Sequence, residues 1–405
     1  MFRNFSLGTK IIAIVSLSII FGISILVGFV IFRTSNTLEL EAEKLLNSAS
    51  NRYANGIQAI SQNVYSGLIS LQGNVKGMYQ LHGKVDIEDL RMFLENVLDT
   101  NSWTSYGYIH MVDRNKYSDG NPLYYTKNGD FIMVLSDANP TSKGGVKAVN
   151  AEPAILNWNS AKRALQDKQE SAGTPRDIRI SGDTVVGYTV TVPLFDNKDK
   201  VIGFVGVVVR IDLLRDELNH PSKSLYKNDQ RLLIADNGLI ASSPKSEFIG
   251  KIISEVNPHP SSSKIVEMQK NKENGIFTFV PASTGEKNIA QLFNFDLWEN
   301  SSQHWSMVII APETSVSKPL YDLVYTILIV SVAILLAVII IIYFYVKYGI
   351  SDRLFRLQNT LFDFFKYVNH ETKNVSLSKD ITSNDEFGSM AKAINDNIQR
   401  TQNAL

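Results

Sequence analysis

Ten side chains between residues 106 and 188 have the types and spacing expected of a small-molecule binding pocket. Tyr106, Tyr108 and His110 alternate along a predicted strand, so they face the same side of it. Aromatic rings form the walls of small-ligand pockets, and a few polar groups orient the ligand. Each tyrosine could instead belong to the core or to the rim. The other candidates follow in the chain: Tyr124, Tyr125, Trp158, Arg176, Asp177, Arg179 and Tyr188.

Catalytic and metal-binding patterns are absent from the sequence. It has no Walker-type phosphate loop, no HExxH and no GxSxG. Its six histidines are scattered, without a metal-ligand partner at short spacing. The lack of cysteine excludes disulfides, thiolate metal sites and cysteine nucleophiles. We therefore expect a protein that is not an enzyme and that binds no metal or cofactor.

The composition favours folded domains without a nucleic-acid partner. The 405 residues include 40 basic and 40 acidic side chains, so the formal net charge is zero. This balance, together with the lack of a basic cluster, argues against nucleic-acid binding. Charged residues make up 20% and aromatic residues 10%, which is typical of chains that fold. The length allows two or three domains.

Two uncharged runs predict membrane spans. Residues 11–32 and 324–346 contain no charge, and a bilayer core about 30 Å thick needs roughly 20 such residues in a helix. A signal peptide is the alternative for the first run, but its apolar region would be only about 7–15 residues long. A buried core helix is the alternative for the second, but such helices are rarely apolar on all sides. We expect transmembrane helices at 11–32 and 323–346.

Basic residues beside the two spans predict the topology. Arg3 and Lys10 precede the first span and Lys347 follows the second, whereas an acidic segment follows the first span. By the positive-inside rule, both termini, including residues 1–10, lie in the cytoplasm. Residues 33–322 then lie in the periplasm of a two-pass inner-membrane protein.

The external region predicts an α+β fold. Residues 37–80 contain no proline, and their apolar residues recur at intervals of three and four, which indicates one long helix. A shorter helix with a break is the alternative. Strand-like segments then recur in two groups, with a helix expected at 153–169 and a loop at 257–263. We expect a distal module at about 81–214 and a proximal module at about 215–315.

Two segments within this region resemble a known sensor family. They read VPLFDNKDKVIGFVGVVVRIDLL at 192–214 and LLIADNGLIASSPKSEFIGKII at 232–253. Over about residues 37–315, the chain resembles the double Cache extracellular sensor of bacterial methyl-accepting chemotaxis receptors. The resemblance implies two PAS-like modules and a small-molecule ligand in the distal one. A homodimer is also expected, since the long helix offers a seam for a partner.

Residues 347–405 resemble a HAMP module. Apolar residues recur at a spacing of four and three from Ile350 to Val368, which is typical of a helix that packs against others. A connector that includes Ile381 follows, and a DEFG sequence at 385–388 opens a second amphipathic helix. The usual proline near the start is absent. A HAMP module is a parallel four-helix bundle made by two chains; a generic juxtamembrane coiled coil is the alternative.

The resemblance also bears on the class of ligand. Family members that bind amino acids carry an Arg-x-Trp-Tyr box, a Tyr-x-Asp pair and a late aspartate that holds the ligand's ammonium group. The corresponding positions here are Asn157-Trp158-Asn159, Pro175-Arg176-Asp177 and Val208. A buried ammonium group without a partner costs on the order of several kcal/mol. We therefore expect a small organic carboxylate held by Arg176 or Arg179, although both arginines could also be solvated.

The expected function is that of a chemotaxis receptor that passes a conformational signal through HAMP. The family continues into a cytoplasmic signalling hairpin, through which a chemotaxis kinase and an adaptor would bind. Since Leu405 lies in the second HAMP helix, we expect a fragment or a truncated product. The alternatives are the sensor half of a histidine kinase or of a cyclic-dinucleotide enzyme, and a ligand binder without signal output.

Overall fold

The computed structural model describes residues 7–378 and 382–404. The chain divides into two compact units. The first, called the sensor unit, is Leu38–Ser317, all of which is described. The second is Met1–Thr37 with Lys318–Leu405. Part of the predicted cytoplasmic segment 1–10 and Ile381 of the predicted connector lie outside the described residues.

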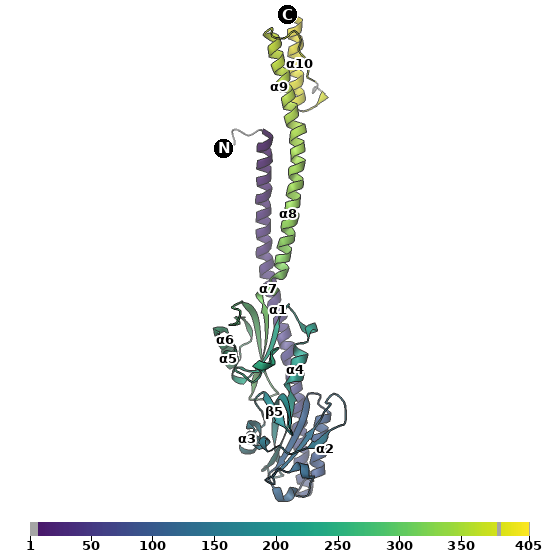
Figure 1. The fold of residues 1–405 in the computed structure, drawn as a ribbon, viewed down its shortest axis with the longest axis vertical. Coiled ribbons are helices and arrows are strands. Elements are labelled where there is room, and N and C mark those ends of the chain that lie inside the picture. Colours follow the sequence, from purple (N-terminus) through teal and green to yellow (C-terminus); the bar gives the residue numbers. More distant parts are fainter. Residues whose placement is uncertain (1–6, 379–381, 405) are drawn as a thin grey trace. The chain divides into compact units, whose positions relative to one another are not determined.

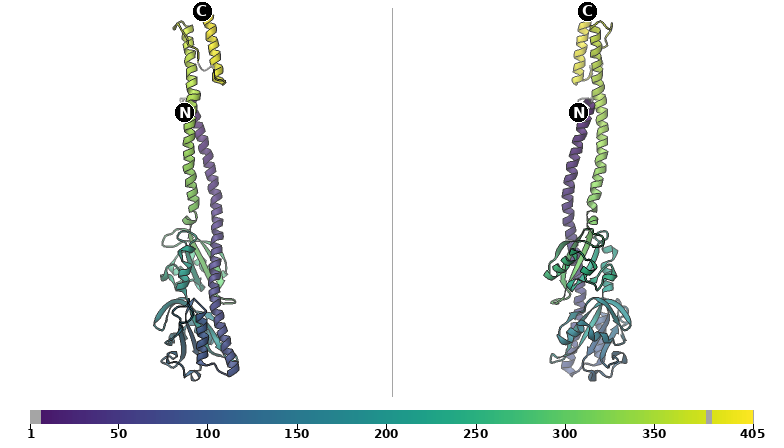
Figure 2. Two further views of the ribbon diagram at one scale, coloured as in Figure 1. Left: turned by 90° about the vertical axis from the view of Figure 1, so that its right-hand side faces the viewer. Right: turned by 60° about the vertical axis from the view of Figure 1, so that its left-hand side comes forward.

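One continuous helix, α1 (Leu7–His82), enters the sensor unit. The predicted long helix is therefore confirmed, and the glycines within it do not break it. In the sensor unit α1 runs beside both sheets (Figure 2). Its buried side chains recur at intervals of three and four because one face of the helix packs on the sheets: Leu46, Ala49, Tyr53, Ile57, Ser61, Val64, Leu68, Leu71 and Val75.

The distal module is built on a seven-stranded antiparallel sheet in the order β3-β2-β1-β7-β6-β4, with β5 paired to β6. Its strands are β1 (Thr104–Met111), β2 (Phe131–Ser136), β3 (Lys147–Val149), β4 (Ser171–Ala172), β5 (Arg176–Ile180), β6 (Asp183–Phe195) and β7 (Val201–Arg210). Helix α2 (Ile87–Asp99) and α1 cover one face of the sheet. The short helix η4 (Pro153–Asn157) and α3 (Asn159–Gln166) cover the other (Figure 1).

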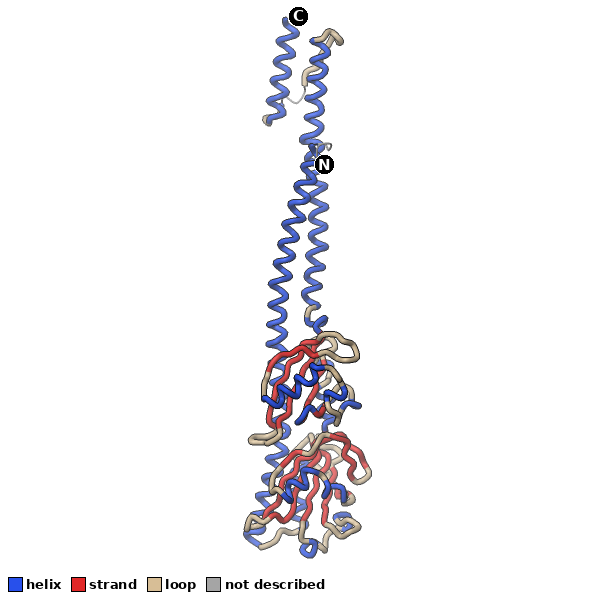
Figure 3. Tube along the Cα trace, turned by 90° about the vertical axis from the view of Figure 1, so that its left-hand side faces the viewer, coloured by secondary structure: helices blue, strands red, loops and turns tan. Residues whose placement is uncertain are grey.

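The proximal module has a separate five-stranded sheet in the order β10-β11-β12-β8-β9 (Figure 3). Its strands are β8 (Gln230–Ala235), β9 (Leu239–Ser242), β10 (Gly275–Phe279), β11 (Asn288–Asp296) and β12 (His304–Pro312). Helix α4 (Ile211–Leu218) connects the two modules. Helices α5 (Ile253–Val256) and α6 (Pro260–Asn271) cover one face of the proximal sheet, and α1 packs on the other. Helix α7 (Glu313–Val316) ends the module.

The predicted α+β class is confirmed, but several local predictions were wrong. The helix expected at 153–169 is interrupted at Trp158, whose extended backbone (φ −66°, ψ 140°) separates η4 from α3. The loop expected at 257–263 contains the start of α6, because Pro260 fits the first turn and His259 accepts a hydrogen bond from the Ser261 amide. Helix α2 was not expected, although Leu90, Leu94 and Leu98 form one buried stripe.

In the second unit, two helical stretches are long and apolar enough to cross a membrane. Their most apolar windows have mean hydropathies of 2.8, near the N-terminus, and 3.3, in the stretch that begins at Lys318. This second stretch comprises α8 (Lys318–Phe344), a π-helical segment (Tyr345–Ser351) and α9 (Asp352–Val368). The described residues therefore contain two candidate membrane helices.

The last helix, α10 (Glu386–Ala404), packs beside α9, and the DEFG sequence begins it. The Asp385 carboxylate accepts a hydrogen bond from the Gly388 amide at 2.9 Å and pairs with Arg353 of α9 at 2.7 Å. A Cβ atom at Gly388 would lie 1.7 Å from the Ser383 carbonyl oxygen, so only glycine fits this turn. The aspartate and the glycine of DEFG therefore have definite structural roles.

Candidate functional site

The face of the distal sheet that α3 covers carries a group of hydroxyl side chains. Strand alternation places Tyr108 on this face, and the register pairs Tyr108 with Gly206 and Gly206 with Thr191. A Cβ atom at Gly206 would lie 2.5 Å from the Tyr108 hydroxyl oxygen. Because glycine is there, the phenol crosses β7 and hydrogen-bonds to Thr191 on β6 at 2.7 Å.

The hydroxyl cluster consists of Tyr108, Ser160, Ser171, Thr189 and Thr191. Thr191 donates to Ser160 at 2.9 Å, and Ser160 and Thr189 share a hydrogen bond of 2.8 Å. Ser171 lies directly opposite Thr191 in the β4–β6 pair, so the two side chains share a face. The Ser171 hydroxyl is buried without a hydrogen-bond partner. A buried hydroxyl without a hydrogen bond costs free energy, and a ligand that hydrogen-bonds to it would recover this cost.

Burial determines the protonation of the phenol in this cluster. Tyr108 is fully buried, and this raises its pKa to about 12, although hydrogen bonds from Thr191 and the positive charge of Arg176 oppose the shift. Tyr108 is therefore neutral near pH 7 and can donate or accept a hydrogen bond.

Trp158 and Arg176 lie at the edge of the hydroxyl cluster. The Trp158 ring meets Tyr108 edge to face, with centroids 5.3 Å apart. The Arg176 guanidinium lies 5.8 Å from the Trp158 ring centroid. Within the described residues, Arg176 has no carboxylate partner. An unpaired guanidinium beside buried hydroxyl groups is suited to bind a carboxylate.

Tyr106 and His110 share the same face but have protein partners. The Tyr106 hydroxyl donates to Asp183 at 2.8 Å. His110 Nδ1 bonds the Phe131 carbonyl oxygen at 2.8 Å, and its ring lies against Phe204. Burial lowers the pKa of His110, so the imidazole is neutral at pH 7.

The other five candidates lie elsewhere, so the ten do not form one site. Tyr124 and Tyr125 contact Phe131 on the α2 side of the sheet. Tyr188 also faces α1: it bonds the Ser61 hydroxyl at 2.8 Å and contacts Trp305. Asp177 and Arg179 are exposed, as Arg176 is, but the strand register turns them away from the face that carries Arg176.

Sequence reasoning missed four residues of the hydroxyl cluster. Thr189 and Thr191 alternate with Tyr188, Val190 and Val192, so a polar stripe on one face of this strand was readable from the sequence. Ser160 and Ser171 gave no such signal, because they join the cluster through contacts made by α3 and β4. Val208, at the expected place of the family's late aspartate, is fully buried among apolar side chains of this face.

Residues 90–216 match a family model described as the first PDC sensor domain of methyl-accepting chemotaxis protein-like proteins. This segment is therefore similar to chemoreceptor-type sensor domains. It contains the whole hydroxyl cluster, Trp158 and Arg176. The predicted resemblance to a chemoreceptor sensor is therefore confirmed. A comparison with curated proteins found no match.

Solved structures show the same fold across the sensor unit. The periplasmic sensory domain of the Campylobacter jejuni chemoreceptor Tlp1 is similar at 22% identity and a TM-score of 0.63, covering 70% of this chain and 99% of that one. The extracellular domain of mmHK1S-Z3, described as a histidine kinase, is similar at 16% identity and a TM-score of 0.56, covering 69% of this chain and 97% of that one. The sensor fold is thus shared by chemoreceptors and kinases.

Proposed function

We propose that this protein is a transmembrane chemoreceptor that senses a small organic carboxylate, such as a hydroxy or keto acid, in its distal module. The observation that carries the proposal is the Arg176 guanidinium, which has no carboxylate partner among the described residues and lies beside the buried hydroxyl cluster. Within this cluster, the Ser171 hydroxyl has no hydrogen-bond partner in the described part of the chain. The guanidinium would bind the carboxylate in a bidentate manner, and the hydroxyl groups would bind a second oxygen of the ligand. Trp158 would form one wall.

The apolar residue at position 208 supports a ligand without an ammonium group. Val208 pairs with Thr189 and is completely buried. A cationic amine placed there would lose its water without gaining an anionic partner. This argument favours an organic acid over an amino acid.

Ligand entry requires movement in this proposal. Tyr108 is fully buried and Trp158 is 7% exposed, so η4 and α3 must move away from the sheet to admit the ligand. The extended backbone at Trp158, between the two short helices, provides a place for this movement. A ligand that binds one arrangement more tightly shifts the population toward it.

The remaining parts of the proposal concern topology and output. Both termini lie in the cytoplasm, the sensor unit lies in the periplasm, and the protein is a homodimer in the inner membrane. Residues 347–405 act as a HAMP module, supported by the two adjacent helices and the DEFG capping contacts. A chemotaxis kinase and adaptor then receive the signal through a signalling hairpin. The similarity to mmHK1S-Z3 supports a second candidate, in which the same sensor controls a histidine kinase.

Calorimetric titration of purified protein with lactate, pyruvate, malate and a set of amino acids tests the ligand class. We expect binding of at least one acid, lost in Arg176→Gln and retained in the matched control Arg179→Gln, since the two arginines lie on opposite faces of β5. An amino acid that binds in place of the acids, or equal effects of the two substitutions, would contradict the proposal.

A further inference from the structure

A second concave site lies between α1, α4 and the loop that leads to the proximal module. Its volume is about 540 Å³, within the range of roughly 300–1,000 Å³ typical of small-ligand sites. We call it the junction groove. It is separate from the hydroxyl cluster, which lies under α3. Thirteen residues line it, among them Arg52, Gly56, Ile60, Trp103, Glu217 and Lys223.

The lining of the junction groove is amphiphilic. Ile57, Ile60 and Trp103 form apolar walls together with leucines from α4 and the loop. Arg52 and Lys223 lie at the polar part, where Lys223 pairs with Glu217. In the described parts of the chain, Arg52 has no carboxylate partner. One positive charge of the lining is therefore unbalanced.

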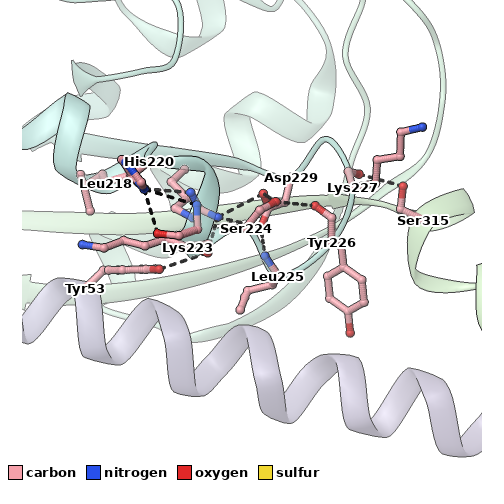
Figure 4. A network of polar contacts seen from close by, with 12 residues as sticks. Tyr53, Leu218, His220, Lys223, Ser224, Leu225, Tyr226, Lys227, Asp229 and Ser315 are labelled. Atoms are coloured by element: carbon pink, nitrogen blue, oxygen red, sulfur yellow. Dashed lines mark hydrogen bonds and ion pairs between the residues drawn. The ribbon is translucent and has the colours of Figure 1, made fainter.

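Buried polar contacts hold the loop wall in place. Arg231, which is 2% exposed, donates to the Leu218 carbonyl at 2.8 Å and also to the Lys223 carbonyl, and it pairs with buried Asp229 at 3.0 Å. Its guanidinium lies 5.7 Å from the ring of Tyr53 on α1. Figure 4 shows Tyr53 of α1 beneath this network of loop residues. A site fixed in this way needs little ordering when a ligand binds.

Gly56 keeps the α1 side of the groove open. A Cβ atom at this position would meet no atom within 4 Å, so the missing side chain leaves space rather than relieving a clash. A glycine in a helix interior is less favourable than alanine, and nothing in the packing around Gly56 requires it.

We propose that the junction groove is a second ligand site, which takes an amphiphilic organic monoanion with one acidic group and a compact apolar body. The acid pairs with Arg52, and the apolar body lies against Ile60 and Trp103. Because α1, α4 and the loop all line the groove, an occupant stabilises the arrangement in which α4 lies against α1.

The test uses the full chain in zwitterionic lipid nanodiscs and follows tryptophan fluorescence during titration with 4-phenylbutyrate. All four tryptophans lie in the sensor unit, and Trp103 is the one in the groove. We expect saturable binding whose signal disappears in Trp103→Phe. The amine 4-phenylbutylamine and the neutral 4-phenylbutanol should bind about tenfold more weakly or not at all.

Substitutions at Gly56 provide a matched pair that retains the helix. Gly56→Leu should weaken 4-phenylbutyrate binding about tenfold or more by filling the groove, whereas Gly56→Ala should bind as the wild type does. Arg52→Gln should weaken binding several-fold. Equal binding by the leucine and alanine variants, or a signal that survives Trp103→Phe, would overturn the proposal. Absence of 4-phenylbutyrate binding would overturn it as well. If Gly56→Leu then sediments as a monomer and the wild type as a dimer, the groove is an interface between copies.

Discussion

Gln303 of the proximal module holds the backbone of Ala172 in the distal module with both ends of its side-chain amide. Its Nε2 donates to the Ala172 carbonyl at 3.0 Å, and its Oε1 accepts from the Ala172 amide. Ala172 follows Ser171, which lies opposite Thr191 in the hydroxyl cluster and whose hydroxyl has no hydrogen-bond partner among the described residues. A strand of two residues therefore connects the candidate ligand site to the proximal module.

We predict that Gln303→Leu weakens the connection between the modules. Both backbone groups of Ala172 lose their partner, which should cost about 1–3 kcal/mol in the free energy of unfolding. Hydrogen exchange of the amides at residues 171–173 should become faster. Gln230→Leu, at an exposed position, is the control and should leave this exchange unchanged. Unaltered exchange in Gln303→Leu would show that the contact does not restrain β4.

A second contact between elements supports a double-mutant cycle. Tyr188 and Ser61 share a buried hydrogen bond of 2.8 Å that joins β6 to α1. Tyr188→Phe leaves the Ser61 hydroxyl buried and unmet, so we expect a loss of about 1–3 kcal/mol. Tyr188→Phe combined with Ser61→Ala removes both polar groups and should lose less than the sum of the two single changes. Urea denaturation measures all four proteins, and strictly additive losses would mean that the hydrogen bond contributes nothing.

Gly206 is predicted to be irreplaceable. A Cβ atom there would lie 2.5 Å from the Tyr108 hydroxyl oxygen and 2.6 Å from the Val190 carbonyl oxygen. Gly206→Ala must therefore displace the phenol from Thr191 or distort the sheet, and we expect a loss of about 1–3 kcal/mol together with the loss of acid binding. Thermal unfolding measures the first effect and calorimetry the second. Gly56→Ala is the control, which should be neutral or stabilise by up to about 1 kcal/mol. If the Gly206→Ala protein were as stable as the wild type, Gly206 could not lie as close to Tyr108 and Val190 as described.

The stability of the sensor unit should depend on pH through His110. Burial, the largest cause, lowers the pKa of His110 below 6.5, while the Phe131 carbonyl and Asp130 oppose the shift and Arg114 reinforces it. The unfolded chain therefore binds the proton more readily than the folded one, so stability falls as the pH drops below about 6.5.

Urea denaturation at pH 7.5 and pH 5.5 measures this effect of His110. The wild type should lose more stability between these two pH values than His110→Gln does, because the substitution removes the titrating group. An equal loss in both proteins would assign the pH dependence to other groups.

Local patterns in the sequence were sufficient to predict the fold class. The uncharged runs at 11–32 and 324–346 and the repeating apolar residues of α1 are properties of neighbouring residues, so they could be read directly. Helix α6 was missed because its N-terminal residues are serine and proline, which also occur in loops. Helix α2 was missed although the spacing of Leu90, Leu94 and Leu98 could be read from the sequence.

The sequence by itself determined that Tyr106, Tyr108 and His110 share one face of a strand, because side chains alternate along every strand. It also determined the apolar spans, which neighbouring residues encode, and the resemblance of two segments to a known family indicated the sensor type. Only the tertiary structure decided that Tyr188 faces α1 whereas Arg176 faces the side of Trp158. The physical reason is that packing between segments far apart in the chain decides which helix covers each face of a sheet. The same packing decides which strand lies opposite. The same packing, and no local pattern, brought Ser160 and Ser171 to Thr191.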